Sequence, residues 1–172
     1  VRLVGAARQR MQQSEATVMA TVESGRVAYG INTGFGAFAN RVIPAQKTKK
    51  LQLNLVRSHA CGVGEPLAPA LVRRMLLLKA NNLAAGFSGV RPLVADTLLA
   101  LLNADVLPVI PAQGSVGASG DLAPLAHLAL ALIGEGEATV PAAAAADERQ
   151  TLTGNDVLRA TGVAPLELQA KE

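Results

Sequence analysis

The residues with the clearest chemical potential form a run of small side chains from Gly114 to Gly120, in which four of seven positions are glycine or alanine. If the amide nitrogen of Gly120 attacks the carbonyl carbon of Ala118, a five-membered ring closes, because glycine has no Cβ to hinder the approach. The Ala118 carbonyl oxygen leaves as one water when the ring closes, and loss of the Ser119 hydroxyl as a second water leaves an exocyclic methylene. The run therefore predicts 4-methylidene-imidazol-5-one, an electron-poor alkene built autocatalytically from the backbone.

Other interpretations of the run are weaker or less specific. A phosphate-binding P-loop requires Lys-Ser/Thr after its last glycine, and the run lacks this pair. The Gly-x-Ser-x-Gly pattern of a nucleophilic serine fails because Asp121 stands where the second glycine belongs. A tight loop that leads into a helix is the structural alternative. Asp121 would then cap that helix, whereas in the chemical interpretation it assists proton transfer.

Tyr29, the only tyrosine, begins the glycine-rich segment of residues 29–36. A phenol has a pKa near 10, so Tyr29 serves as a base only where its surroundings stabilise the phenolate. A half-buried core tyrosine is the structural alternative.

The two histidines, His59 and His127, have structural interpretations of their own. His59, with Cys61 and Glu65, matches no familiar closed metal site, so we expect no metal. A packing or capping role is the ordinary interpretation of His59. We expect His127 to pack in the core with a satisfied ring nitrogen, and Cys61 to be a small buried side chain.

The elements that position these residues are predicted to be mostly helical, with little β-structure. Leu- and Ala-rich segments with helical spacing alternate with glycine-rich breaks. An extended stretch is expected around Pro108 and Pro111, and a small hairpin from 135–140 and 149–152. Asn155 is expected to cap a short helix, and Pro165 to open the last one. The expected helices span residues 2–24, 45–60, 70–85, 92–103, 120–133 and 155–160.

Composition narrows the class of protein. The chain has 172 residues, of which 50% are hydrophobic and 2% aromatic. Its net charge is +3 and its basic residues are scattered, so we expect no nucleic-acid partner.

The longest apolar run, residues 122–133, is too short to cross a bilayer, and we expect no membrane association. A single cysteine fits a reducing compartment, which predicts a cytoplasmic location. Both ends lie within helix-like patterns, which suggests part of a longer polypeptide or an oligomer.

Several motifs, in order along the chain, resemble those of the aromatic amino acid lyase family, which includes histidine and phenylalanine ammonia-lyases. The resemblance implies that residues 1–172 are an N-terminal portion of the catalytic domain, truncated at both ends and without the C-terminal helical bundle. It also implies the helical fold of that family, with glycine-rich active-site loops. The matching motifs are residues 29–36, 57–67, 88–92 and 114–127.

The same resemblance implies roles for individual residues. Tyr29 would be the catalytic base that removes a β-proton, and His59 would face the substrate side chain. Asn32, Arg57 and Asp121 would give support near the ring formed by residues 118–120. No metal and no diffusible cofactor are expected.

The segment that follows His59 resembles the histidine-acting members most closely. This implies conversion of L-histidine to urocanate and ammonia, a reaction of histidine degradation, in a homotetramer. Two alternatives stay open at this point. The chain could act on tyrosine or phenylalanine, as a lyase or an aminomutase. It could also be a non-catalytic fragment or a helical interaction module whose motif stays uncyclised.

Overall fold

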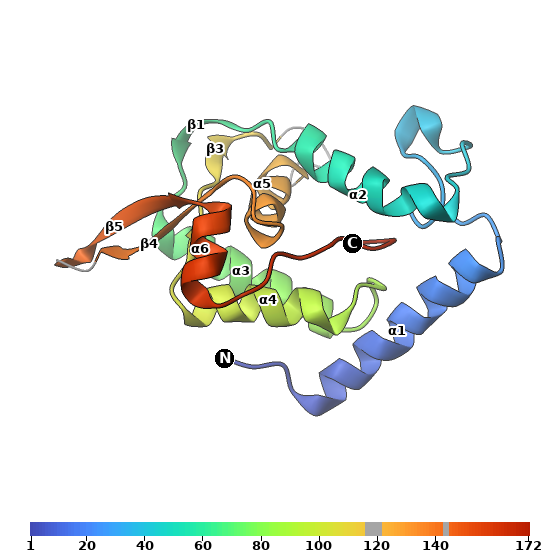
Figure 1. Ribbon diagram of the computed structural model, residues 1–172, viewed down its shortest axis with the longest axis horizontal. Coiled ribbons are helices and arrows are strands. Elements are labelled where there is room, and N and C mark those ends of the chain that lie inside the picture. The colour runs from blue at the N-terminus through green and yellow to red at the C-terminus, as the bar shows by residue number, and fades with distance from the viewer. Residues whose placement is uncertain (116–121, 143–144) are drawn as a thin grey trace.

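Six α-helices and one short 3-10 turn form within residues 1–115, 122–142 and 145–172, the part of the chain that the computed structural model describes (Figure 1). The mainly helical fold expected from the sequence is thus confirmed. The helices lie within a few residues of the predicted segments. They are α1 (Gly5–Glu23), η1 (Gly36–Phe38), α2 (Ala45–His59), α3 (Pro69–Ala84), α4 (Pro92–Asn103), α5 (Leu122–Leu132) and α6 (Gly154–Thr161).

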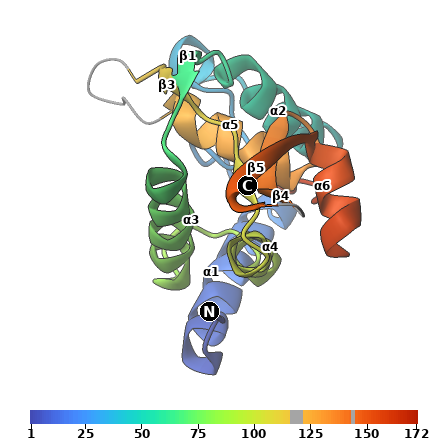
Figure 2. The ribbon, with the colours of Figure 1, turned by 90° about the vertical axis from the view of Figure 1, so that its left-hand side faces the viewer.

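The helices form two groups. In Figures 1 and 2, α2 and α5 lie above α1, α3 and α4. Both α3 and α4 begin with a proline in the first turn, where the missing amide hydrogen costs nothing. The core is aliphatic because aromatics are scarce. Its fully buried members include Leu76, Leu98, Leu101, Ile110 and Leu158.

Two small antiparallel sheets complete the fold. β1 (Val63–Pro66) pairs with β3 (Pro111–Gln113), and β4 (Glu137–Ala142) joins β2 (Leu107–Pro108) to β5 (Ala145–Thr153). The predicted hairpin is therefore confirmed as β4 and β5. The first sheet brings the segment after α2 beside the segment before the glycine run, because β1 follows α2 and β3 precedes that run.

Two local predictions were wrong. The N-cap of α6 is Thr153, whose hydroxyl oxygen accepts a hydrogen bond from the Asp156 amide at 3.3 Å, so Asn155 lies inside the helix. No helix begins at Pro165. Instead, Leu166 and Leu168 are buried at alternating positions, and the Leu166 amide donates to the Leu132 carbonyl at 2.9 Å. Docking onto α5 in an extended conformation buries both leucines, which explains the absence of the helix.

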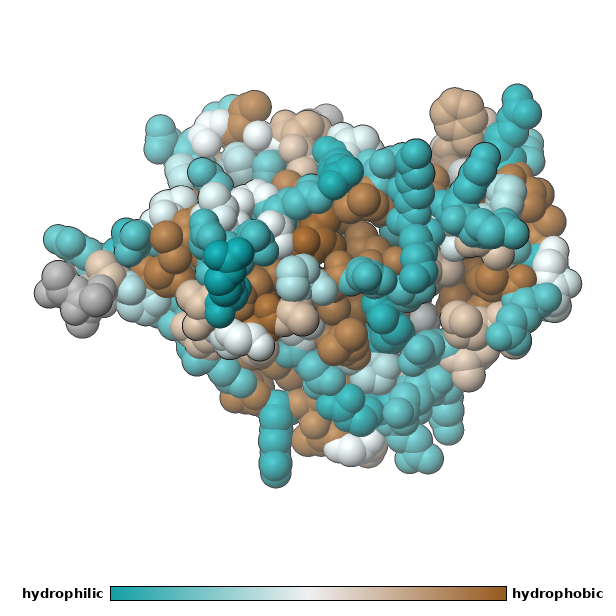
Figure 3. All heavy atoms as spheres, in the orientation of Figure 1, coloured by the Kyte–Doolittle hydropathy of each residue, from teal (hydrophilic) through white to brown (hydrophobic). Residues whose placement is uncertain are grey.

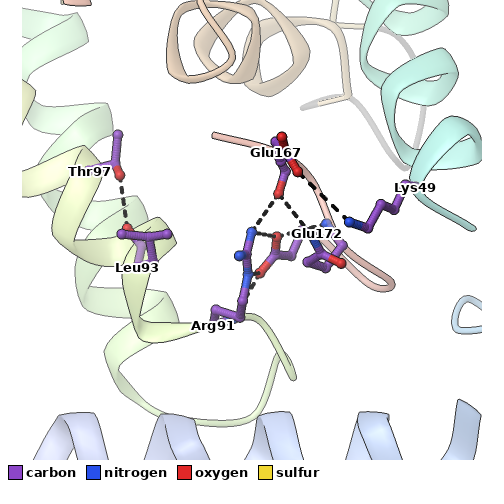
Figure 4. Close-up of polar contacts among 7 residues, drawn as sticks. Lys49, Arg91, Leu93, Thr97, Glu167 and Glu172 are labelled. Carbon is purple, nitrogen blue, oxygen red and sulfur yellow. Dashed lines mark hydrogen bonds and ion pairs between the residues drawn. The ribbon is translucent and has the colours of Figure 1, made fainter. Parts of the chain in front are cut away.

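A buried carboxylate fastens this C-terminal segment to the loop before α4 (Figure 4). The Arg91 guanidinium donates to both carboxylate oxygens of Glu172, at 2.7 and 2.6 Å, and to the Glu167 carbonyl at 2.6 Å. The Glu172 side chain is only 1% exposed. Lys49 of α2 adds a longer, exposed contact to Glu167 at 3.8 Å. The Arg91 ion pair therefore links the end of the chain to one of the motifs found in the sequence.

Several large apolar side chains are exposed on the surface of the described residues. Figure 3 shows apolar side chains exposed along the middle of the face seen in Figure 1. Phe87 is 92% exposed and Leu78 is 66% exposed. Contiguous exposed apolar surface marks a place where further protein packs.

Among the helices in the described ranges, none has both the length and the apolar character that a membrane-spanning helix needs.

Candidate active site

Tyr29 lies in the loop that joins α1 to α2, and buried polar side chains hold this loop in shape. Asn32 is 5% exposed. Its Oδ1 accepts from the Ala28 amide at 2.8 Å, and its Nδ2 donates to the Arg26 carbonyl at 2.9 Å. Both hydrogen bonds close over the residues beside Tyr29. Asn32 thus positions the backbone of the candidate base, and its predicted place near the ring stays a prediction.

Thr33 and Gly30 complete this support. The Thr33 hydroxyl accepts from the Gly30 amide at 3.3 Å and donates to the Gly34 carbonyl at 2.8 Å, and the side chain is 2% exposed. Gly30 has a φ of 74°. Residues other than glycine rarely adopt this left-handed conformation. The glycine is therefore needed for the turn that presents Tyr29.

The Tyr29 side chain projects outward from this rigid turn. It is 64% exposed, and its ring packs edge-on against Phe35, with centroids 5.9 Å apart and planes at 67°. A tyrosine held this way is available to a ligand but is not enclosed by the described residues. The half-buried core alternative does not apply.

His59 is the last residue of α2, and its ring is oriented by its own helix. Nδ1 lies 2.9 Å from the Leu55 carbonyl oxygen and 3.0 Å from the Ser58 hydroxyl. A carbonyl oxygen only accepts, so Nδ1 carries the hydrogen in this contact. Nε2 of the neutral ring is therefore left as a hydrogen-bond acceptor.

Arg57 is committed to an ion pair. Its Nε donates to both carboxylate oxygens of Glu135, at 3.2 and 2.9 Å, and its Nη2 also donates to this carboxylate. The hydrogen bonds from Arg57 lower the pKa of Glu135. The pair connects the C-terminal end of α2 to the turn after α5, so Arg57 positions the helix that carries His59.

The two flanks of the glycine run contact each other. A Cβ on Gly114 would lie 3.0 Å from the Ala123 Cβ and 3.1 Å from the Gly62 Cα. Ala118, Ser119, Gly120 and Asp121 lie outside the described residues. Close flanks are compatible with the backbone approach that ring formation requires. The run leads into the N-terminal end of α5, where the helix dipole favours added electron density.

His127 meets the expectation of a satisfied ring nitrogen. It is half-buried on α5, and its Nε2 accepts from the Gly62 amide at 3.0 Å. Burial lowers the pKa of His127, which keeps the ring neutral and able to accept.

The described residues bring some candidates together and leave others apart. Gly62, three residues after His59 at the C-terminal end of α2, meets the first flank of the glycine run and His127. The Tyr29 loop instead lies at the N-terminal end of this helix (Figure 1). At the usual rise per residue, the helix is about 22 Å long. Cys61, expected to be buried, is exposed in the connection after α2. Within the described ranges, no three His, Cys, Asp or Glu side chains cluster as metal ligands.

Sequence reasoning missed three residues that shape this region. Thr33 lies inside a matching motif, so its small polar side chain between glycines was a usable signal. Gly62 lies inside the matching motif of residues 57–67, but nothing in the sequence marks its backbone as a packing element. Glu135 gave no signal, because its partner is 78 residues away in sequence.

This combination of fold and motifs is that of a known class. The family model for aromatic amino acid lyase matches residues 1–172, and the chain belongs to that family. Among its relatives, histidine ammonia-lyase of Anaeromyxobacter dehalogenans is 55% identical over 172 residues, which cover 99% of this chain and 34% of that protein.

Solved structures show the same fold. Histidine ammonia-lyase of Trypanosoma cruzi superposes with a TM-score of 0.84 at 40% identity, over 98% of this chain and 31% of that one. Phenylalanine aminomutase of Pantoea agglomerans gives 0.89 at 31% identity, over 100% of this chain and 32% of that one. The chain spans about a third of the length of the curated relatives it matches.

Proposed function

We propose that this chain is the N-terminal third of a histidine ammonia-lyase, which converts L-histidine to urocanate and ammonia. The observation that carries the proposal is the orientation of His59. With Nδ1 held by the Leu55 carbonyl, Nε2 is presented as an acceptor. The imidazole N–H of a histidine substrate is a matching donor.

The residues of the chain divide the reaction between them. Residues 118–120 would form 4-methylidene-imidazol-5-one, which would supply an electrophile for the substrate amine and so make the amine a better leaving group. The Tyr29 hydroxyl oxygen, as phenolate, removes the β-proton. His59 orients the substrate ring so that this proton faces the base. Gly114 and Ala123, whose contact holds the flanks of the run together, support the ring.

Further copies or segments complete the site in this proposal. The Tyr29 loop and His59 lie at opposite ends of α2, and Tyr29 is largely exposed. A homotetramer in which each site draws residues from more than one subunit would enclose both. The exposed apolar side chains are the surfaces that such an assembly would cover. We propose a cytoplasmic location without metal, nucleic-acid or membrane partners.

The test is a substrate comparison with the full-length protein that carries this chain. We expect urocanate from L-histidine, followed by its absorbance, and much slower turnover of L-tyrosine and L-phenylalanine. His59→Phe should raise KM for L-histidine about tenfold or more, because a substrate N–H loses its acceptor, while His59→Gln keeps an acceptor and most of the affinity. Release of ammonia from L-phenylalanine but not from L-histidine would contradict the proposal.

A tyrosine-acting lyase or aminomutase is the second candidate. The same Nε2 acceptor suits a phenol O–H, and a solved structure of tyrosine aminomutase is 35% identical over 100% of this chain. In that case L-tyrosine, and not L-histidine, would be consumed by the wild-type protein. The same substrate comparison separates the two candidates.

A further inference from the structure

His127 joins three segments that are distant in sequence. It lies on α5, four residues after Ala123, and so on the same side of the helix. Its Nε2 accepts from the amide of Gly62, in the connection that follows His59. A Cβ on Gly62 would lie 3.1 Å from this nitrogen and 3.2 Å from the Pro111 Cβ.

Gly62 in turn touches the first flank of the glycine run. A Cβ on Gly114 would lie 3.1 Å from the Gly62 Cα and 3.0 Å from the Ala123 Cβ. The pairing of β1 with β3, with Val63 opposite Gln113, brings these backbones side by side. Gly62 is therefore packed between the residue that enters the run and the helix that leaves it.

We infer that His127 is a positioning residue for ring formation, which acts by holding Gly62 against the flanks of the glycine run. The inference rests on the proposed function, since it assumes that residues 118–120 cyclise. The hydrogen bond from Gly62 fixes the spacing between α5 and the connection after α2. Without an acceptor at this position, the Gly62 amide loses its partner and its backbone shifts away from Gly114.

The role requires an acceptor atom and not only a filled volume. Phenylalanine fills at least the volume of histidine but has nothing to accept from the Gly62 amide. Glutamine is less well matched in shape, but its Oε1 reaches about as far as Nε2 and accepts. Packing alone would therefore favour His127→Phe, whereas the positioning role favours His127→Gln.

The test compares these variants in the full-length protein by intact mass, since ring formation removes the mass of two waters. We expect the wild type and His127→Gln to show this deficit, and His127→Phe to form the ring about tenfold more slowly. Leu128→Ala is the matched control, because it removes a buried side chain from the next position of α5 without touching Gly62. It should lower thermal stability and leave the deficit in place.

The outcomes separate the two proposals. If the wild type and His127→Phe show the same two-water mass deficit, only the role of His127 is overturned. If Leu128→Ala and His127→Phe lose the mass deficit equally, the role of His127 is also overturned, because general destabilisation then accounts for the loss. A wild type that keeps its full sequence mass refutes the proposed function and, with it, this inference.

Discussion

At the level of single residues, the candidate site separates side chains that would react from side chains that hold them. Among the described residues, the Tyr29 hydroxyl and His59 Nε2 have no hydrogen-bond partner, whereas Asn32 and Arg57 form hydrogen bonds within the chain. Sequence resemblance places all four near the chemistry without this distinction. Their hydrogen bonds give each a different expected phenotype.

Replacing Tyr29 should affect catalysis and not ring formation. Tyr29→Phe keeps the aromatic side chain and its edge-on contact with Phe35 but removes the hydroxyl. We expect kcat for L-histidine to fall by about a hundredfold or more in the full-length protein, the usual contribution of a positioned base, with the two-water mass deficit unchanged. A variant with wild-type kcat would exclude Tyr29 as the base.

Replacing Asn32 should act through the loop. Asn32→Ala leaves the Ala28 amide and the Arg26 carbonyl without this partner, so the Tyr29 turn loses its internal support. We expect kcat to fall about tenfold, less than in Tyr29→Phe, together with faster proteolysis of the loop between α1 and α2. An unchanged rate of cleavage would show that Asn32 does not hold the loop.

The pKa of His127 predicts a pH dependence of stability. Burial lowers this pKa below its ordinary value of 6.5, so the unfolded chain binds the proton more readily than the folded chain. The contribution of neutral His127 is therefore complete above about pH 6.5 and is lost as the pH falls below that value. Between about pH 7.5 and pH 5.5, thermal unfolding should shift less in His127→Gln than in the wild type. Glu135 titrates equally in both proteins, so an identical shift would rule out a contribution from His127.

At the level of elements, helices could be predicted well from the sequence because their signals are local. Pro69 and Pro92 mark the starts of α3 and α4, and leucine spacing marks their buried sides. The C-terminal segment could not be predicted, because its extended form depends on a partner elsewhere. Leu166 bonds to Leu132, and Glu172 meets Arg91 across 81 residues. The same holds for the packing of Gly62 against Gly114, which no spacing along the chain reveals.

The Arg91–Glu172 pair should contribute more to stability than an exposed pair. Arg91→Ala leaves a carboxylate that is 1% exposed without its main partner. This loss costs about 2–3 kcal/mol after allowance for the partly exposed arginine. We expect the midpoint of thermal unfolding of the chain to fall by roughly 5–10 °C. Arg8→Ala breaks an exposed pair with Asp96 and is the matched control, with little expected change. Equal effects of the two variants would contradict this ranking.

At the level of the whole molecule, the chain has the fold of its family, but its described residues do not enclose Tyr29. Gly62, three residues after His59, packs against the first flank of the glycine run, while the exposed Tyr29 loop lies at the other end of α2. The motifs predict which residues form the site, and that assignment stays a prediction. Their separation could not be predicted, because each motif reports only its own neighbourhood.

The isolated 172-residue chain should therefore associate and remain inactive. Exposed side chains such as Phe87 and Leu78 favour self-association, so size-exclusion chromatography should show species larger than a monomer. Steady ammonia release from L-histidine should be absent. A monomeric chain with sustained turnover would contradict the proposal that other segments complete the site.

The central claim is that residues 118–120 are converted into an electrophile. Its most direct test is the mass of the peptide that spans Gly114–His127, released from the full-length wild-type protein. We predict a deficit equal to two waters confined to this peptide, and at most a one-water deficit in Ser119→Ala, which keeps the small side chain but has no hydroxyl to eliminate as the second water. A wild-type peptide with its full sequence mass would contradict the account.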